Sequence, residues 1–184
     1  MVRVELYESM ADLAQVRALL EANHVRTVEP ALWQSQGFVT MEYTVDELAS
    51  ICGKYRHVVA KDGDNVVGYA LVLLAERKAP FTILADMFRK IATASFGGVP
   101  IREGDYFVMG QVCIAHDYRG QGIFGRLYQA LKRQMKDDFK LVITEVSDKN
   151  ARSMGAHLAI GFRDITLAEP DPSEWHVVAW DLRA

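Results

Sequence analysis

The stretch Arg119-Gly120-Gln121-Gly122-Ile123-Phe124-Gly125 decides how this chain is interpreted. It follows an apolar, strand-like segment at residues 108–114 and precedes a segment with helical spacing at residues 126–136. Glycines let a backbone approach a ligand closely, and the first N–H groups of a helix have no partner within that helix. The turn is therefore typical of a phosphate-binding site, to which Arg119 adds a positive charge. A turn that only joins a strand to a helix is the alternative.

Two common phosphate loops fit this stretch poorly. The lysine followed by serine or threonine that ends a nucleoside-triphosphate loop is absent. A dinucleotide-binding loop requires an acidic residue about 20 residues after its glycines, in a β-α-β unit. Glu145 lies near that distance, so this second exclusion is only partial.

The segments after the loop continue an ordered alternation of elements. Residues 141–146 form an apolar run that a single carboxylate, Glu145, interrupts. A polar turn at residues 147–150 follows, and residues 151–160 have helical spacing that ends at Gly161. The predicted order is strand, glycine loop, helix, strand, polar turn, helix and strand.

Two motifs in this order resemble those of the GNAT superfamily of acyl-CoA N-acyltransferases. Arg119-x-x-Gly122 is similar to the pyrophosphate loop R/Q-x-x-G-x-G/A of that superfamily. Asn150-x-x-Ser153, followed by Gly161-Phe162, resembles its second signature. The resemblance implies an α/β (α+β) fold in one domain, with a mixed central sheet whose parallel strands diverge and which helices flank.

The resemblance also implies acetyl-CoA as co-substrate, and no metal. Backbone groups of a diverging strand would bond the pantetheine arm, and N–H groups of the loop would meet the pyrophosphate. The sequence departs from the family pattern at Phe124, where glycine or alanine is usual, and at His157, where many members have the tyrosine used as general acid. The implied cofactor-binding residues are Val112, Cys113, Ile114, Arg119, Gly120, Gln121, Gly122, Ile123, Phe124, Gly125, Asn150 and Ser153.

Length and composition fit a single domain over residues 1–184, with 50% hydrophobic and 24% charged residues. The formal net charge of −3 and the lack of a lysine or arginine block argue against nucleic acid as a partner. No apolar stretch reaches about 18 residues, so no membrane span is expected, and the N-terminus does not read as a signal peptide. Cys52 and Cys113 are expected to be reduced, small apolar side chains, which favours a cytoplasmic protein.

Local signals predict the remaining elements. Capping patterns at Ser9 and Thr44 each precede a helix, and residues 57–76 are predicted to form a β-hairpin. An inserted segment at residues 79–104 contains Ile83, Met87 and Ile91 at helical spacing. It predicts an amphipathic helix that forms either a packed flap or the contact of a homodimer. Strands are expected at residues 162–166 and 175–182, with a turn at residues 170–172 between them.

Glu145 is the first candidate for a general base or for a group that orients the acceptor. A carboxylate inside an apolar strand is costly unless it is paired, and burial raises its pKa toward a range useful for proton transfer. Divergence of the parallel strands should leave Gln111 or Glu145 facing the gap. In the alternative, Glu145 faces solvent or pairs with a basic residue such as Arg152. Asp105 is a weaker candidate and is more typical of a surface loop.

His157 is the candidate general acid. Helical spacing places it on the face of Ser153, where the resembled family directs its tyrosine at the thioester sulfur. An imidazolium with a pKa of about 6.5 can protonate a thiolate with a pKa of about 8.5. In the alternative, His157 packs beside the cofactor and solvent protonates the sulfur. Tyr128 is expected in the core, and Asn150 is expected to cap the helix that begins at residue 151.

The leading hypothesis is an enzyme that transfers the acetyl group of acetyl-CoA to a primary amine of an unidentified acceptor, by direct attack on the thioester. A rival is an acyl-CoA-binding module of the same fold with weak or no catalysis, and a third option is a scaffold that dimerises through the insertion. Candidate acceptor contacts are Glu29, Trp33, Gln34, Gln36, Phe38, Met87 and Phe88.

Overall fold

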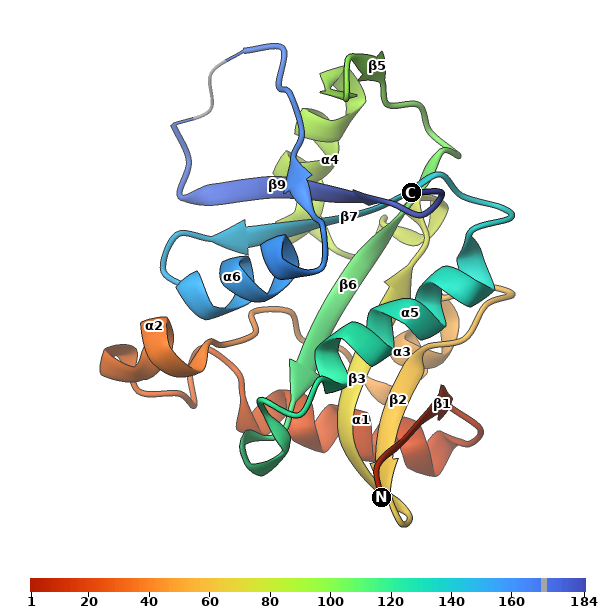
Figure 1. The fold of residues 1–184 in the computed structure, drawn as a ribbon, viewed down its shortest axis with the longest axis vertical. Helices are drawn as coiled ribbons and strands as arrows, with labels where there is room; N and C mark the ends of the chain where they lie inside the picture. The colour runs from red at the N-terminus through yellow and green to blue at the C-terminus, as the bar shows by residue number, and fades with distance from the viewer. Residues whose placement is uncertain (170–171) are drawn as a thin grey trace.

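The computed structural model describes residues 1–169 and 172–184, so the turn predicted at residues 170–172 lies largely outside the described residues. Within them, seven strands form the main sheet in the order β1-β2-β3-β6-β7-β9-β8 (Figure 1). Every neighbouring pair is antiparallel except β6 and β7, which are parallel. The strands are β1 (Arg3–Leu6), β2 (Val58–Asp62), β3 (Asn65–Leu73), β6 (Tyr106–Ile114), β7 (Leu141–Ser147), β8 (Arg163–Asp164) and β9 (Trp175–Asp181).

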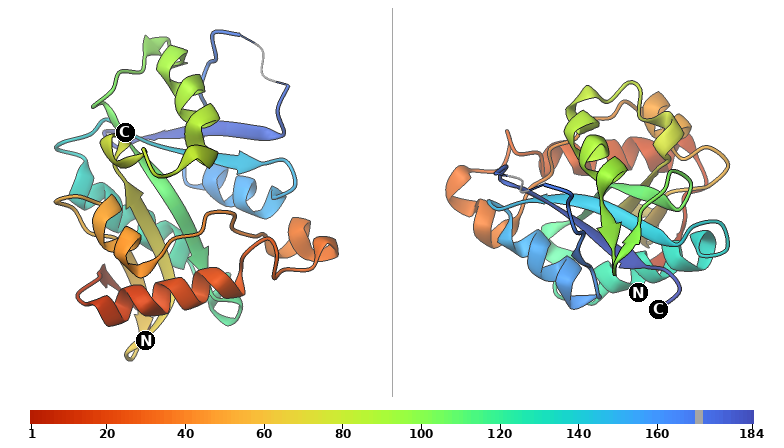
Figure 2. Two further views of the ribbon diagram at one scale, coloured as in Figure 1. Left: turned by 180° about the vertical axis from the view of Figure 1, so that it is seen from behind. Right: turned by 90° about the horizontal axis from the view of Figure 1, so that it is seen from above.

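Helices cover both faces of this sheet (Figure 2). One face carries α1 (Met10–Ala22), α3 (Val45–Ile51) and α4 (Ala85–Thr93), and the other carries α5 (Ile123–Met135) and α6 (Ala151–Ala159). The short α2 (Trp33–Gln36) lies beside α6. No helix in the described ranges is long and apolar enough to cross a membrane. Further 3-10 turns lie at Pro30–Leu32, Ala75–Arg77, Thr82–Leu84 and His116–Tyr118.

The two-sided burial of the sheet explains its apolar strands. Successive side chains of a strand point to opposite faces. In β3, Leu71 and Leu73 pack with α1, α3 and α4, whereas Ala70 and Val72 pack with α5. Because both faces are covered, β3 reads as a continuous apolar run instead of an alternating pattern.

The parallel strands β6 and β7 diverge. They pair only from Tyr106 opposite Leu141 to Val108 opposite Ile143, although β6 continues to Ile114 and β7 to Ser147. Figure 1 shows the two strands separating from this common end. The predicted fold class, a mixed sheet with diverging parallel strands and flanking helices, is confirmed.

The register of β3 with β6 shifts where the gap begins. Leu71 lies opposite Gln111, but Val72 lies opposite Met109, so Gly110 is an extra residue in β6. A side chain at Gly110 would meet the Tyr43 hydroxyl at 3.2 Å, and that hydroxyl donates a hydrogen bond to the Gly110 carbonyl. Glycine fits this bulge because other chain segments approach it closely.

The segment predicted as an insertion, residues 79–104, packs against the rest of the same chain. It contains α4 and the two-stranded ribbon of β4 (Ser95–Phe96) and β5 (Val99–Pro100). Met87, Phe88 and Ile91 of α4 are buried in the same core as α1 and α3. Met87 and Ile91 of the predicted apolar face therefore pack within the chain, which fits the flap alternative. Ile83 lies before α4, in the turn Thr82–Leu84, and is 65% exposed.

Both predicted helix caps are present. Thr44 Oγ1 accepts a hydrogen bond from the Glu47 N–H at 3.1 Å, and the Glu47 carboxylate accepts one from the Thr44 N–H at 2.7 Å. Ser9 Oγ likewise accepts from the Asp12 N–H at 3.2 Å. These bonds satisfy helix N–H groups that have no partner within the helix.

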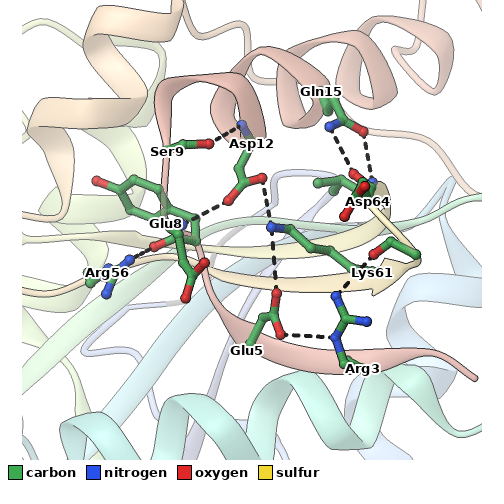
Figure 3. Close-up of polar contacts among 12 residues, drawn as sticks. Arg3, Glu5, Glu8, Ser9, Asp12, Gln15, Arg56, Lys61 and Asp64 are labelled. Atoms are coloured by element: carbon green, nitrogen blue, oxygen red, sulfur yellow. Dashed lines mark hydrogen bonds and ion pairs between the residues drawn. The ribbon is translucent and has the colours of Figure 1, made fainter.

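The Asp12 carboxylate takes part in a buried ion pair that fastens α1 to the sheet (Figure 3). Its Oδ1 lies 2.8 Å from the ammonium of Lys61, and its Oδ2 accepts a hydrogen bond from the Glu8 N–H. Glu5 lies 3.5 Å from the same ammonium. Burial opposes ionisation of Asp12, but the hydrogen bond from Lys61 and those from backbone N–H groups outweigh it and lower the pKa of Asp12 below its usual value.

We expect Asp12→Ala to lower the free energy of unfolding by about 3 kcal/mol at pH 7, the low end for a broken buried pair because Glu5 still faces Lys61. Since the pKa of Asp12 is lowered in the folded state, its contribution is present above about pH 4 and is lost as the pH falls further. Urea unfolding at pH 7 and pH 3 measures both effects. Asp137→Ala, at an exposed position, is the control. An equal loss for the two variants would contradict the role of the pair.

Candidate functional site

The glycine loop presents a row of backbone donors at the start of α5. Gly120 and Gly122 have φ values of 75° and 72°, in the left-handed region that favours glycine. Gly122 is the N-cap of α5, and no side chain caps the helix. Among the described residues, the N–H groups of residues 120–125 donate to no acceptor. This geometry suits an anion, because unpaired N–H groups and the helix dipole act together.

Arg119 holds the loop in place from its first residue. Its guanidinium donates to the carbonyl of Ile114 at 2.9 Å, to the carbonyl of Gln36 at 2.9 Å and to the side-chain oxygen of Asn23 at 2.8 Å. It therefore joins the end of β6 to the segment after α1. Burial lowers the pKa of Arg119, but an arginine keeps its charge at neutral pH.

A cavity of about 320 Å³ opens beside these donors, and we call it the glycine-loop cavity. Gln121 and Gly125 do not line it. The other residues of the implied cofactor-binding set do: Val112, Cys113, Ile114, Arg119, Gly120, Gly122, Ile123, Phe124, Asn150 and Ser153. The fold thus brings together residues of this set that are up to 41 positions apart in the sequence, from Val112 to Ser153.

A second cavity, of about 370 Å³, lies in the gap between β6 and β7, and we call it the strand-gap cavity. Residues 108–112 of β6 and 144–147 of β7 line its two sides, and the insertion contributes Ile83, Leu84, Asp86 and Met87. Five residues line both cavities, so the two cavities adjoin: Phe38, Val39, Val112, Asn150 and Ser153.

Asn150 and Gly37 shape the junction of the cavities. The Asn150 side chain accepts a hydrogen bond from the Ser153 N–H at 3.1 Å and donates one to the Phe38 carbonyl at 2.9 Å. It therefore caps α6, as predicted, and also fixes the segment opposite. A side chain at Gly37 would lie 2.9 Å from the Asn150 oxygen, so only glycine fits there.

Glu145 lies in the strand-gap cavity and is paired. Its side chain is 14% exposed and lies 3.2 Å from the ammonium of Lys90, which comes from α4 and is 4% exposed. This contact matches the alternative in which Glu145 pairs with a basic residue, but the partner is Lys90 and not the example Arg152, which donates to the Ser35 carbonyl at 3.4 Å. No local pattern links Lys90 to Glu145, which lies 55 positions away.

Asp105 lies at the opposite end of β6, where the strands are still paired. Its carboxylate lies 2.6 Å from the ammonium of Lys140. The hydrogen bond from Lys140 lowers the pKa of Asp105, against a smaller effect of burial. These contacts match the surface-loop alternative, away from both cavities.

His157 is 1% exposed, and both of its ring nitrogens have partners. Nδ1 donates to the Ser153 carbonyl at 2.8 Å, and Nε2 accepts from the Tyr128 hydroxyl at 2.7 Å. Burial lowers the pKa of His157 to about 4, so the ring is neutral at pH 7. The two hydrogen bonds and the neutral ring fit the packing alternative, and the general-acid role of His157 stays a prediction. Tyr128 is buried in the core, as predicted.

Gln111 also faces the strand gap, as expected of a polar residue in this strand. It donates to the Tyr69 hydroxyl at 2.9 Å and accepts from the Met41 N–H at 3.1 Å. These bonds fix the segment before α3 against the sheet and close one side of the cavity.

The predicted acceptor contacts divide into two groups. Gln36, Phe38 and Met87 line a cavity. Among the others, Trp33 donates to the Val28 carbonyl and Gln34 to the Asp148 carbonyl, so they stabilise the loop instead. Glu29 and Phe88 line neither cavity. The sequence did not single out the remaining wall of the strand gap, which includes Thr40, Met41, Leu84, Asp86, Thr144 and Trp175.

Several solved structures to which this chain is similar are named as acetyltransferases. The ribosomal-protein-S18-alanine N-acetyltransferase from Escherichia coli shares 14% identity, with 99% of this chain and 94% of that chain covered and a TM-score of 0.61. The Salmonella typhimurium protein yncA, solved with its cofactor acetyl-CoA, gives the same identity, coverages and TM-score. A phosphinothricin acetyltransferase from Sinorhizobium meliloti, in complex with acetyl-CoA, shares 16% identity, with 98% and 88% covered and a TM-score of 0.62. At such identities the likeness shows the fold.

Comparison with curated protein sequences gave no match. The model of the acetyltransferase (GNAT) family matches residues 23–162, which include the glycine loop, both diverging strands and the α6 signature. Since this match spans more than half of the 184 residues, the chain belongs to the acetyltransferase (GNAT) family.

Proposed function

We propose that this protein transfers the acetyl group of acetyl-CoA to a primary amine, which attacks the thioester directly. The observation that carries the proposal is the junction of the two cavities at Val112, Asn150 and Ser153. The glycine loop lines one of these cavities and the Glu145 carboxylate lines the other. A thioester at the junction would meet an amine from the opposite side.

The glycine-loop cavity fits coenzyme A. The free N–H groups of residues 120–125 would hold the pyrophosphate at the N-terminus of α5. Beyond Val108, the backbone of β6 no longer pairs with that of β7, although the Thr144 hydroxyl donates to the Met109 carbonyl. Backbone groups of β6 near Val112 would bond the pantetheine arm instead. Acetyl-CoA is present in the two neighbouring structures whose names mention it.

Glu145 is the proposed general base. Its carboxylate lines the strand-gap cavity, where an amine that attacks a thioester at the junction must lose a proton. Asn150 and Ser153 orient the reactants, since hydrogen bonds fix both residues at the shared wall. With His157 neutral, the leaving thiolate, whose ordinary pKa is about 8.5, takes its proton from solvent.

The names of the similar structures do not identify the acceptor of this protein. One is named for a ribosomal protein and another for phosphinothricin, which are different acceptors. The thiols of Cys52 and Cys113 are free and buried, and a reduced protein that uses acetyl-CoA fits the cytoplasm.

Release of free CoA thiol from acetyl-CoA tests the proposal. With a panel of primary amines we expect thiol to appear in proportion to the acetylated amine, which mass spectrometry identifies. A catalytically inactive acyl-CoA-binding module is the second candidate, and the absence of the family tyrosine at His157 favours it. Binding of CoA in calorimetry without turnover of any amine would establish the module and refute the enzyme.

A further inference from the structure

The two cavities carry opposite charges. Arg119 and Arg152 are the charged residues among the described lining of the glycine-loop cavity. Asp86 and Glu145 line the strand-gap cavity, together with the neutral His157. No lysine or arginine of the described chain lines the strand gap. The charge pattern directs an anionic ligand to the first cavity and a cationic one to the second.

Lys90 does not offer a site for an anion in the strand gap. An ammonium has three N–H donors. Those of Lys90 face Asp86 at 2.9 Å, Glu145 at 3.2 Å and Ser173 Oγ at 2.9 Å. Asp86 also pairs with Arg89. The two carboxylates line the cavity, whereas Lys90 and Arg89, the cations that pair with them, do not line it.

The rest of the strand-gap wall is largely apolar. Met41, Leu84, Met87 and Trp175 line it, from three separate parts of the chain. A volume of about 370 Å³ lies in the range of cavities that bind small molecules. These side chains stabilise an apolar group that is removed from water.

We infer that the acceptor is a small cationic primary amine with an apolar body and without a carboxylate beside the amine. The inference rests on the proposed function. When the amine reaches Glu145, the carboxylate of an α-amino acid lies only two bonds away from the amine nitrogen. It would be brought against Glu145 and Asp86 in a cavity that no lysine or arginine of the described residues lines, and like charges so placed repel.

Pairs that consist of an amino acid and its decarboxylated amine test this inference. Phenethylamine and phenylalanine share one apolar body and differ in the carboxylate, as do tryptamine and tryptophan, and isoamylamine and leucine. We expect kcat/KM to be at least about 100-fold higher for the amine of each pair. Equal or greater efficiency with the amino acids would overturn the inference while acetyl transfer stands. CoA binding without acetylation of any amine would refute the proposed function and the inference with it.

Asp86→Asn provides a second readout that does not remove the proposed base. Asp86 is 52% exposed, so we expect a modest loss, with the discrimination between phenethylamine and phenylalanine reduced by about fivefold, mainly through a higher KM for phenethylamine. Asp137→Asn makes the same change in net charge at an exposed position outside both cavities and should leave the ratio unchanged. An unchanged ratio in Asp86→Asn would overturn the assignment of Asp86 to acceptor selection.

Discussion

Glu145→Gln is expected to lower kcat by about 10²- to 10³-fold while the affinity for acetyl-CoA stays unchanged. General bases contribute rate factors of this order, and glutamine keeps the size of the side chain and an oxygen that can accept from Lys90. Glu145 lines the strand-gap cavity but not the glycine-loop cavity, so the loss should fall on the chemical step. Steady-state kinetics with the best amine, together with calorimetry of CoA binding, measures the two quantities separately.

The pH dependence distinguishes a lost base from a disturbed site. Without the carboxylate, the reaction depends on amine that has already lost its proton, and this fraction grows up to the ordinary pKa of an alkyl ammonium, about 10. The activity of Glu145→Gln should therefore rise with pH well above neutrality. Glu103→Gln, at an exposed turn before β6, is the matched control. Wild-type kcat in Glu145→Gln would show that another group removes the proton.

Gly122→Ala is expected to weaken acetyl-CoA binding by about 10- to 100-fold. The left-handed backbone conformation of Gly122 costs a residue with a side chain about 1–2 kcal/mol. If the backbone relaxes to relieve this strain, the N–H groups of the loop no longer point together at the proposed pyrophosphate site. The added methyl group would also project into the open space beside the loop, where no protein atom lies within 4 Å. Calorimetry with CoA measures the loss.

Gly63→Ala provides the control for backbone strain. Gly63 lies in the turn between β2 and β3, has a φ of 60°, and likewise has no atom within 4 Å of an added side chain. Both variants should lose similar stability in urea unfolding, but only Gly122→Ala should lose affinity. Equal affinities for CoA would show that the loop does not hold the diphosphate, and the proposed function would lose its main support.

Elements that depend on short-range signals could be predicted from the sequence. The caps at Ser9 and Thr44, the glycine loop and the helix in the insertion each follow from neighbouring residues, and the structure contains all of them. The divergence of β6 and β7 came from the family resemblance and not from the residues of the strands, since an apolar run does not reveal where pairing stops.

The environment of the candidate catalytic residues could not be predicted in this way. The partner of Glu145 comes from the insertion, and its approach depends on how α4 packs against β7 and β9. The neutral state of His157 depends on burial by several elements at once, including contacts with Phe124 and Phe162 at ring distances of 5.1 Å and 4.9 Å. Such collective effects leave no signature in the residues nearby in the sequence.

Substitutions in the walls of the two cavities have different consequences, depending on whether the residue lines one cavity or both. Val112, Asn150 and Ser153 border both spaces, so a substitution there alters the handling of donor and acceptor together. Four residues of the insertion line the strand-gap cavity alone: Ile83, Leu84, Asp86 and Met87. Substitutions in this short segment should therefore change which acceptors bind and leave the residues around the thioester unchanged. Both enzyme engineering and divergence after gene duplication can use this separation.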